Sequence, residues 1–401
     1  MIEVNARLIF LLGFLAAVAL YVWRDKKLER HSILFIRRTK KGIKTIDRIA
    51  KRFPRFWNFY GWAGVFTGLV SVFAALAMLL YTFYDMAVRQ SAQNGPSLIL
   101  PGTVSETTFQ AGVSFVPAEY WVISIIVMMT VHELSHGIVA RAEDIELRSV
   151  GWVIVGILPL GAFVEPEGEK MMPDDEDEYG KEDGDEEESQ ATWDVGNWKS
   201  RLKVLCAGSF ANYITAVLFF VLATGLTAGL TSPTLFYNAQ DGYPAQEAGM
   251  DNGTIIAVNG EKIESFDQLR SITGEIEAGE EVSMWTSEGN FTLTAVEREG
   301  HENGYIGILM GQQNTINEEY SDYQGGLSWF ISMLTTVAFL NFLIGLFNMA
   351  PIKPLDGGLV LETFTTEFVG EDGLENVNRF SLAMWALLLL SLLLGLSASY
   401  L

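Results

Sequence analysis

Long apolar runs constrain what this chain can fold into more than any other feature. A helix that crosses a bilayer needs about 20 consecutive, mostly apolar residues. Six stretches of the sequence meet that length: residues 5–23, 60–84, 119–140, 202–230, 327–350 and 379–400. Because a bilayer offers no water to backbone amides, such a run must form a helix that bonds its own amides. The sequence therefore predicts a polytopic α-helical membrane protein with about six transmembrane helices.

The charge and cysteine content restrict the partners of such a protein. The 401-residue chain carries a formal net charge of −22, which opposes binding to the phosphates of a nucleic acid. We therefore expect no nucleic-acid partner, and the lipid bilayer is the partner that the spans imply. Cys206 is the single cysteine, which excludes an intramolecular disulfide and a zinc site built from cysteines. We interpret Cys206 as a small core residue.

The charges of the loops predict the orientation in the membrane. Residues 24–55 hold thirteen Lys or Arg against three acidic residues, and the positive-inside rule places this loop in the cytoplasm. Nucleic-acid binding is another interpretation of the segment, but its position between two spans already explains the charge. The spans then alternate, so residues 85–118 and 231–326 lie outside, whereas residues 141–201 and 351–378 lie in the cytoplasm.

Three segments between the spans have patterns of their own. Residues 147–164 are apolar, glycine-rich and broken by Pro159, which is typical of a short membrane-associated β-hairpin. Residues 165–189 carry fourteen Asp or Glu, which is typical of a solvated linker. Residues 235–315 alternate short apolar runs with Gly, Asn and Asp turns. This last pattern predicts a small β-rich domain outside the membrane.

His132, Glu133 and His136 form an H-E-x-x-H motif near the C-terminal end of the third span. On a helix the i, i+4 spacing puts both imidazoles on one face, where they can reach one Zn²⁺. Glu133 lies beside them and can take a proton from a water on the metal. Ionisable residues are costly within an apolar span, which favours a functional site over a polar cluster that braces neighbouring helices.

A second segment offers the ligand that two histidines leave missing. Catalytic zinc sites have three protein ligands and one open position. Asp356 follows the fifth span in a turn broken by Pro351 and Pro354, and the predicted topology puts it on the same side as His136. We expect Asp356, although it would also suit a plain turn, to complete a site for one Zn²⁺ per chain. Asn348 could donate to an oxyanion or bind substrate backbone there.

Together these segments resemble the site-2 protease family of intramembrane zinc metalloproteases, which is peptidase family M50. HELSHG in one span and NMAPIKPLDGG in a later span carry the resemblance. Residues 147–164 resemble the family's membrane-inserted hairpin, residues 207–212 (AGSFAN) its AGPxxN stretch, and residues 242–269 its PDZ domain. The resemblance covers about residues 120–365.

The resemblance implies a role for each matched residue. The implied zinc ligands and catalytic base are His132, His136, Asp356 and Glu133. Asn348 would be a substrate-binding residue. Asn212 would be a second one, or a helix-packing residue, since Ser209 replaces the proline of that stretch.

The resemblance also implies an activity and a domain organisation. A site-2 protease hydrolyses peptide bonds in or near the transmembrane segments of membrane-anchored regulatory proteins. The catalytic core would occupy residues 119–230 and 327–401, with its site toward the cytoplasm. A PDZ-like domain, residues 231–326, would lie outside and take a peptide ligand, although Gly253-Thr254 departs from the usual Gly-Asp and puts peptide capture in doubt. Residues 1–118 form a predicted two-helix membrane anchor with a basic cytoplasmic loop, and their sequence indicates no role beyond anchoring.

Two other classes of protein compete with this interpretation. A catalytically silent scaffold could use the outer domain to bind peptides, but the complete set of metal ligands argues against it. A transporter could also contain broken helices and buried carboxylates, but the sequence has no repeated halves.

Overall fold

The computed structural model describes residues 6–89, 96–104, 107–108, 112–156, 158–166, 197–298 and 303–398. The chain divides into two compact units, Met1–Phe220 with Met333–Leu401, and Val221–Ser332. Most of the predicted acidic linker, from residue 167 onward, lies outside the described residues, and its first two residues end a β-strand.

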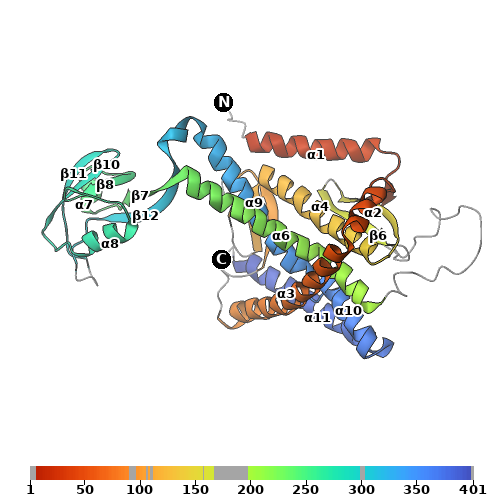
Figure 1. The fold of residues 1–401 in the computed structure, drawn as a ribbon. Coiled ribbons are helices and arrows are strands. Elements are labelled where there is room, and N and C mark those ends of the chain that lie inside the picture. The colour runs from red at the N-terminus through yellow and green to blue at the C-terminus, as the bar shows by residue number, and fades with distance from the viewer. Residues whose placement is uncertain are drawn as a thin grey trace, which may run out of the picture. The chain divides into compact units, whose positions relative to one another are not determined.

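Six helices in the described part of the chain are long and apolar enough to cross a membrane (Figure 1). They are α1 (Ala6–Arg24), α3 (Pro54–Val88), α4 (Ala118–Ala142), α6 (Trp198–Leu230), α9 (Gln324–Asn348) and α11 (Leu374–Ala398). Each helix overlaps one of the six apolar runs, so the predicted spans are confirmed by length and composition. Pro54 occupies the first turn of α3, where the missing N–H is not needed by the helix.

Glycines on α3 allow this helix to approach α6 closely. A Cβ added to Gly68 would lie 2.6 Å from the Sγ of Cys206, and one added to Gly61 would lie 3.0 Å from the side chain of Lys203. Small residues at such contacts are typical of helices that pack within a membrane. Cys206 is fully buried in the core of the first unit, which confirms the interpretation of this cysteine as a core residue.

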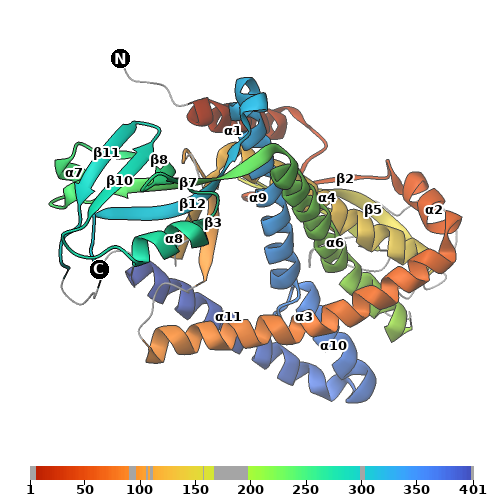
Figure 2. The same cartoon turned by 60° about the vertical axis from the view of Figure 1, so that its left-hand side comes forward.

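Two shorter helices complete the first unit. Helix α2 (Ile43–Arg52) packs on α4 and buries Ile46 and Ala50, while its last turn carries Lys51 and Arg52. Helix α10 (Asp356–Phe368) lies beside α11, and α11 also runs alongside α3 (Figure 2). The segment between α9 and α11, predicted only as a proline-broken turn, therefore contains a helix that begins at Asp356.

A four-stranded antiparallel sheet lies beside α4 in the order β1-β2-β5-β6. Strands β5 (Leu147–Val155) and β6 (Leu158–Pro166) form the predicted hairpin. The other two strands, β1 (Glu29–His31) and β2 (Leu34–Thr39), come from the basic loop, and β2 pairs with β5 along its length. The basic loop therefore contributes two strands to this sheet, which its charge did not indicate, because strand pairing over a long sequence separation cannot be read from charge.

The segment between α3 and α4, for which the sequence predicted only a side of the membrane, contains strands. Strand β3 (Ser97–Gly102) pairs in parallel with β4 (Gly112–Pro117), which leads directly into α4. The indole N–H of Trp121 in α4 donates to the carbonyl of Ile99 in β3, at 3.2 Å. These contacts fix the N-terminal end of the helix that carries the H-E-x-x-H motif.

The second unit contains a β-sheet in the order β11-β10-β8-β7-β12, with β9 paired to β8. Its strands are β7 (Thr231–Ala239), β8 (Asn252–Val258), β9 (Glu261–Lys262), β10 (Glu281–Thr286), β11 (Gly289–Thr294) and β12 (Ile308–Ile316). Helices α7 (Pro244–Glu247) and α8 (Phe266–Gly274) complete it, and Tyr237, Leu269 and Met284 are fully buried. The prediction of a small β-rich domain at residues 235–315 is confirmed.

Candidate metal centre

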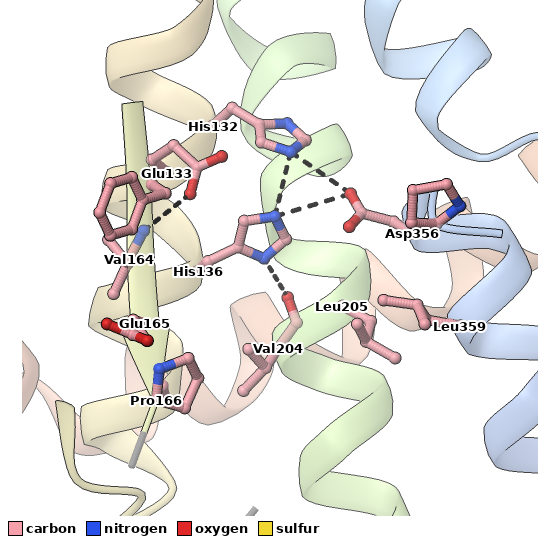
Figure 3. A pocket seen from close by; sticks show the side chains of 13 residues that line it. His132, Glu133, His136, Val164, Glu165, Pro166, Val204, Leu205, Asp356 and Leu359 are labelled. Atoms are coloured by element: carbon pink, nitrogen blue, oxygen red, sulfur yellow. Dashed lines mark hydrogen bonds and ion pairs between the residues drawn. The ribbon is translucent and has the colours of Figure 1, made fainter. Parts of the chain in front are cut away.

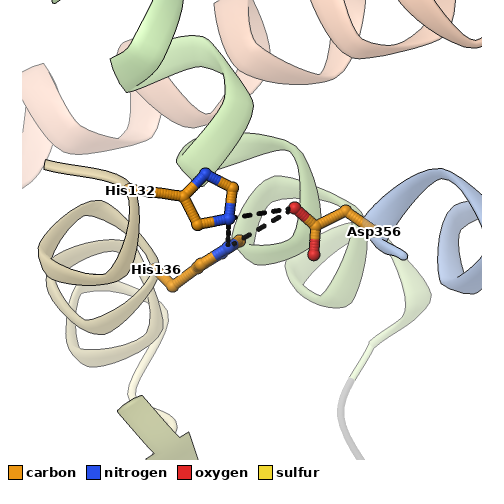
Figure 4. Close-up of side chains that lie close together, drawn as sticks. All are labelled: His132, His136 and Asp356. Atoms are coloured by element: carbon orange, nitrogen blue, oxygen red, sulfur yellow. Dashed lines mark hydrogen bonds and ion pairs between the residues drawn. The ribbon is translucent and has the colours of Figure 1, made fainter. Parts of the chain in front are cut away.

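Helix α4 presents both histidines of the motif on one face, as the sequence predicted. His132 and His136 lie one turn apart, and their Nε2 atoms are 3.0 Å from each other (Figure 4). The side chains of His132 and His136 are 10% and 13% exposed, so both rings lie largely inside the protein. Two imidazole nitrogens this close favour a shared cation between them, because nitrogen lone pairs that face each other repel.

Asp356 is brought to the histidines by the first turn of α10. Its Oδ2 lies 3.3 Å from Nε2 of His132 and 3.6 Å from Nε2 of His136 (Figure 4). The two glycines that follow allow this placement, because the turn before α10 folds back onto the helix. A Cβ on Gly357 would lie 2.2 Å from the carbonyl oxygen of Met349, and one on Gly358 would lie 2.5 Å from the carbonyl carbon of Ile352.

These three groups could hold a metal ion. Their ligand atoms all lie within 4.8 Å of one another, and donors around a tetrahedral zinc are about 3.3 Å apart when the bonds are near 2.0 Å. Oδ2 of Asp356 is buried and, within the described residues, accepts no hydrogen bond of ordinary geometry. A buried carboxylate oxygen without a donor is costly unless a cation neutralises it. The donor set and its spacing therefore fit a zinc ion.

The second nitrogen of each imidazole is held by α6, which orients both rings. The Nδ1–H of His136 donates to the carbonyl of Val204 at 2.7 Å, and this leaves Nε2 free to bind a metal. The side-chain amide of Asn212 lies 3.2 Å from Nδ1 of His132. The atom at this distance is Nδ2, and Oδ1 of Asn212 has no hydrogen-bond partner among the described residues. Turning the amide over would let Oδ1 accept the Nδ1–H of His132, the tautomer whose Nε2 is free to bind a metal. Such partners fix the tautomer and the orientation of metal-binding histidines.

Gly208 is a residue of the site whose role the sequence analysis missed. A Cβ at this position in α6 would lie 2.4 Å from Nε2 of His136 and 2.6 Å from Cε1 of His132. No side chain fits there while both rings keep their positions. The signal was present in the sequence, since Gly208 belongs to the AGSFAN stretch, but only the packing of α6 on α4 shows what the glycine does.

Glu133 lies in a pocket of about 280 Å³, which both histidines and Asp356 also line (Figure 3). Its Oε2 accepts a hydrogen bond from the backbone N–H of Val164 in β6, at 3.0 Å. The walls come from α4, β6, α6 and α10, and the other lining residues are Ala140, Phe163, Val164, Glu165, Pro166, Val204, Leu205, Pro354 and Leu359. A carboxylate, three possible metal donors and a strand edge therefore share one cavity.

The two asparagines singled out from the sequence both lie next to His132. Asn212 is fully buried against the ring. Asn348, the last residue of α9, has its Nδ2 3.4 Å from Nε2 of His132. The structure thus brings both to the site, while a substrate-binding role for either one stays a prediction.

Ser135, inside the motif, joins three helices, and the sequence analysis missed this as well. Its Oγ donates to the carbonyl of Ala207 in α6 at 2.9 Å and lies 2.9 Å from the hydroxyl of Tyr60 in α3. All three residues are buried. This contact holds α3, α4 and α6 in register around the candidate metal centre.

The helices and this site together define a class: polytopic membrane proteins with an H-E-x-x-H metal centre completed by an aspartate. The profile of peptidase family M50 matches residues 120–392. The chain belongs to this family, and it is a zinc metallopeptidase. The resemblance drawn from the two motifs is thereby confirmed.

Relatives of known sequence agree with this assignment. The chain is 28% identical over 370 residues to an uncharacterized protein of Methanocaldococcus jannaschii, with 90% of this chain and 86% of the relative covered. It is 23% identical over 332 residues to a protein of Clostridium acetobutylicum named "putative zinc metalloprotease", covering 66% of this chain and 92% of that protein. A protein of the same name in Clostridium perfringens is 26% identical over 294 residues, covering 58% and 83%.

Proposed function

We propose that this protein is an intramembrane endopeptidase of site-2 protease type. It cleaves peptide bonds in or near the transmembrane segments of membrane-anchored regulatory proteins. The observation that carries the proposal is the pocket that Glu133 shares with His132, His136 and Asp356, because α4, which bears three of these residues, is long and apolar enough to span a membrane. A peptidase site on such a helix acts on chains that enter the bilayer.

His132, His136 and Asp356 would hold one zinc ion through two nitrogens and one carboxylate oxygen. A zinc ion bound there supplies Lewis acidity toward a peptide carbonyl and toward water. The protein contributes the rigid geometry: Val204 and Asn212 hold the rings by their far nitrogens. The open side of the three donors is where substrate and water enter.

Glu133 is the catalytic base and then the acid of this proposal. Its carboxylate takes the proton of the attacking water and delivers that proton to the nitrogen of the leaving amine. The hydrogen bond from Val164 keeps Oε2 on the β6 side of the pocket. Asn348, next to His132, would bind the substrate backbone, and Asn212 would support the ring of His132.

The outer edge of β6 is the proposed docking place for the opened substrate. A transmembrane helix bonds all its amides internally and must unwind before a carbonyl is accessible. Strand β6 is an edge strand, and the N–H of Val164 faces away from β5 toward Glu133. By alternation, the amide group of Ala162 faces the same edge. An extended peptide could add there as a further strand.

The topology of the proposal follows from the loop charges. The basic segment before α3 would lie in the cytoplasm, and the catalytic pocket would lie toward that side. The sheet domain in Val221–Ser332 would lie outside as a PDZ-like module that takes a peptide ligand.

Substitution of the proposed base tests the function. In proteoliposomes with a model transmembrane substrate, wild type should cleave, and Glu133→Gln should lose at least about 10²-fold in rate while retaining about one zinc per chain. Glu146→Gln, at an exposed acid shortly after α4 and outside the pocket lining, serves as the matched control and should cleave. Equal cleavage by wild type and Glu133→Gln would contradict the proposed peptidase mechanism and favour the alternative of a catalytically silent scaffold.

A further inference from the structure

Strand β6 carries a buried carboxylate directly beside the residue that binds the proposed base. Glu165 follows Val164, lines the catalytic pocket and is 3% exposed. A buried carboxylate without a compensating cation or hydrogen-bond donor strongly destabilises the fold. The groups that bind the Glu165 carboxylate therefore also fix the end of β6, including the backbone N–H of Val164 that donates to Glu133.

The cation that faces Glu165 comes from the basic N-terminal loop. Nε of Arg38, in β2, lies 3.3 Å from Oε2 of Glu165, and both side chains are buried. Ser149 in β5 donates to the same Oε2 at 2.6 Å, and the more exposed Arg148 lies 3.9 Å from Oε1. Arg38 also pairs with Glu29 of β1. The four strands thus share one buried polar cluster.

The strand register explains how Arg38 reaches past β5. Arg38 stands opposite Gly151, and Ser149 stands opposite Glu165. Residues two apart on a strand share a face, so Arg38, Ser149 and Glu165 lie on the same side of the sheet. A Cβ on Gly151 would lie 2.0 Å from the carbonyl oxygen of Arg37, so only glycine lets β2 approach this closely.

We propose that Arg38 is a positioning residue for the catalytic base, acting through Glu165 and the β6 backbone. Residues 29–39 precede the part of the chain that matches the M50 family, which begins at residue 120. The segment before the family core therefore completes one wall of the catalytic pocket. The inference rests on the proposed role of Glu133. It gives Arg38, in the basic loop of the first 118 residues, a part in catalysis beyond anchoring.

The neighbouring residue on the same strand gives a matched control. Arg37 forms an ion pair with Asp25 at 2.9 Å and lies on the opposite face of β2. Arg38→Met and Arg37→Met each remove one ion-paired guanidinium from β2, but only the first removes the nearer and more buried cation of Glu165, leaving Arg148 at 3.9 Å. Arg38→Lys keeps the charge and loses the planar guanidinium.

The experiment measures kcat, KM, zinc per chain and melting temperature in proteoliposomes, for these variants, wild type and Glu133→Gln. We expect Arg38→Met to retain zinc and to lose roughly 10- to 100-fold in kcat, as a displaced catalytic group does. Arg38→Lys should recover part of this loss, and Arg37→Met should keep the wild-type kcat. A kcat for Arg38→Met within twofold of that for Arg37→Met overturns the inference.

Glu165→Gln keeps the test decisive if Arg38→Met does not fold. It preserves the side-chain shape and an oxygen that can accept from Ser149, and it removes the charge that Arg38 binds. We expect zinc to be retained and kcat to fall at least tenfold, with non-additive losses in the double variant of Arg38→Met and Glu165→Gln. Wild-type kcat in Glu165→Gln overturns the inference. An active Glu133→Gln would instead remove the proposed function itself.

Discussion

The backbone amide of Val164 donates a hydrogen bond to the carboxylate of Glu133 across 3.0 Å. This contact joins the edge strand of the four-stranded sheet to the helix that carries both histidines. The place of the carboxylate in the pocket therefore depends on the strand as well as on its own helix. The proposed metal ligands and the proposed base are supported by different parts of the fold, so substitutions can separate metal binding from turnover.

Replacing Gly208 by alanine should weaken zinc binding. The new Cβ would lie 2.4 Å from Nε2 of His136, so the ring must leave the position in which it faces Asp356. Alanine is a better helix former than glycine by about 1 kcal/mol, and α6 should remain folded. We expect zinc affinity to fall at least about tenfold, the lower limit for losing the support of a ligand, measured by competition with a chromogenic chelator.

Gly225→Ala is the matched control for that substitution. Gly225 lies in the same helix and has no atom within 4 Å of the added Cβ. It should bind zinc as wild type does. Wild-type zinc affinity in Gly208→Ala would contradict the placement of α6 against the histidines.

Removing the metal should lower the melting temperature, and Asp356→Asn should weaken that response. A ligand at 100 times its Kd stabilises the folded state by about 2.7 kcal/mol, so zinc returned after chelation should raise the melting temperature of wild type. Asn keeps the shape of Asp356 and loses its charge, which is the charge facing both imidazoles. Differential scanning fluorimetry measures both melting temperatures. If zinc raised the melting temperature of wild type and of Asp356→Asn equally, the metal would bind elsewhere.

Asn212→Leu should reduce zinc affinity by about 10- to 100-fold, as the loss of a partner behind a metal-binding histidine does. The substitution removes the group 3.2 Å from Nδ1 of His132. Asn341→Leu is the control, because Asn341 is also fully buried but donates to Val337 of its own helix. If Asn212→Leu and Asn341→Leu lowered zinc affinity equally, the loss would come from burying a leucine and not from losing the contact with His132.

Helix α11 should support the metal centre by binding the turn between α9 and α10, which leads into Asp356. Lys353 in this turn donates its N–H to Oγ of Ser381 at 2.7 Å, and its carbonyl accepts from the indole of Trp385 at 2.9 Å. Ser381→Ala with Trp385→Phe leaves both backbone groups without these partners, at about 1–3 kcal/mol each. We expect a lower melting temperature and weaker zinc binding in a titration.

Ser391→Ala tests whether that effect is specific to the turn. Ser391 is a buried serine of α11 that donates to Leu387 in its own helix, at 2.9 Å. It should change neither zinc binding nor the melting temperature by a comparable amount. Unaltered zinc binding in the Ser381→Ala, Trp385→Phe variant would show that the turn holds Asp356 without α11.

Much of the local structure was predictable because it depends on residues near each other in sequence. The six spans follow from the length of apolar runs, and the i, i+4 spacing puts His132 and His136 on one face. The hairpin at 147–164 follows from its glycine and proline content. In contrast, pairing of β2 with β5 joins segments more than 100 residues apart, and the charge of the basic loop indicated only a membrane-proximal position.

The sequence by itself determined the spans, the motif on α4 and the chemical character of the site, since helical periodicity and bilayer thickness act along the chain. The tertiary structure decided that Oδ2 of Asp356 lies 3.3 Å from His132, that Gly208 makes room for both rings, and that Val164 binds Glu133. It also decided that Arg38 faces Glu165. These relationships depend on how separate helices and strands pack, which is set by side-chain volume and backbone approach between distant segments.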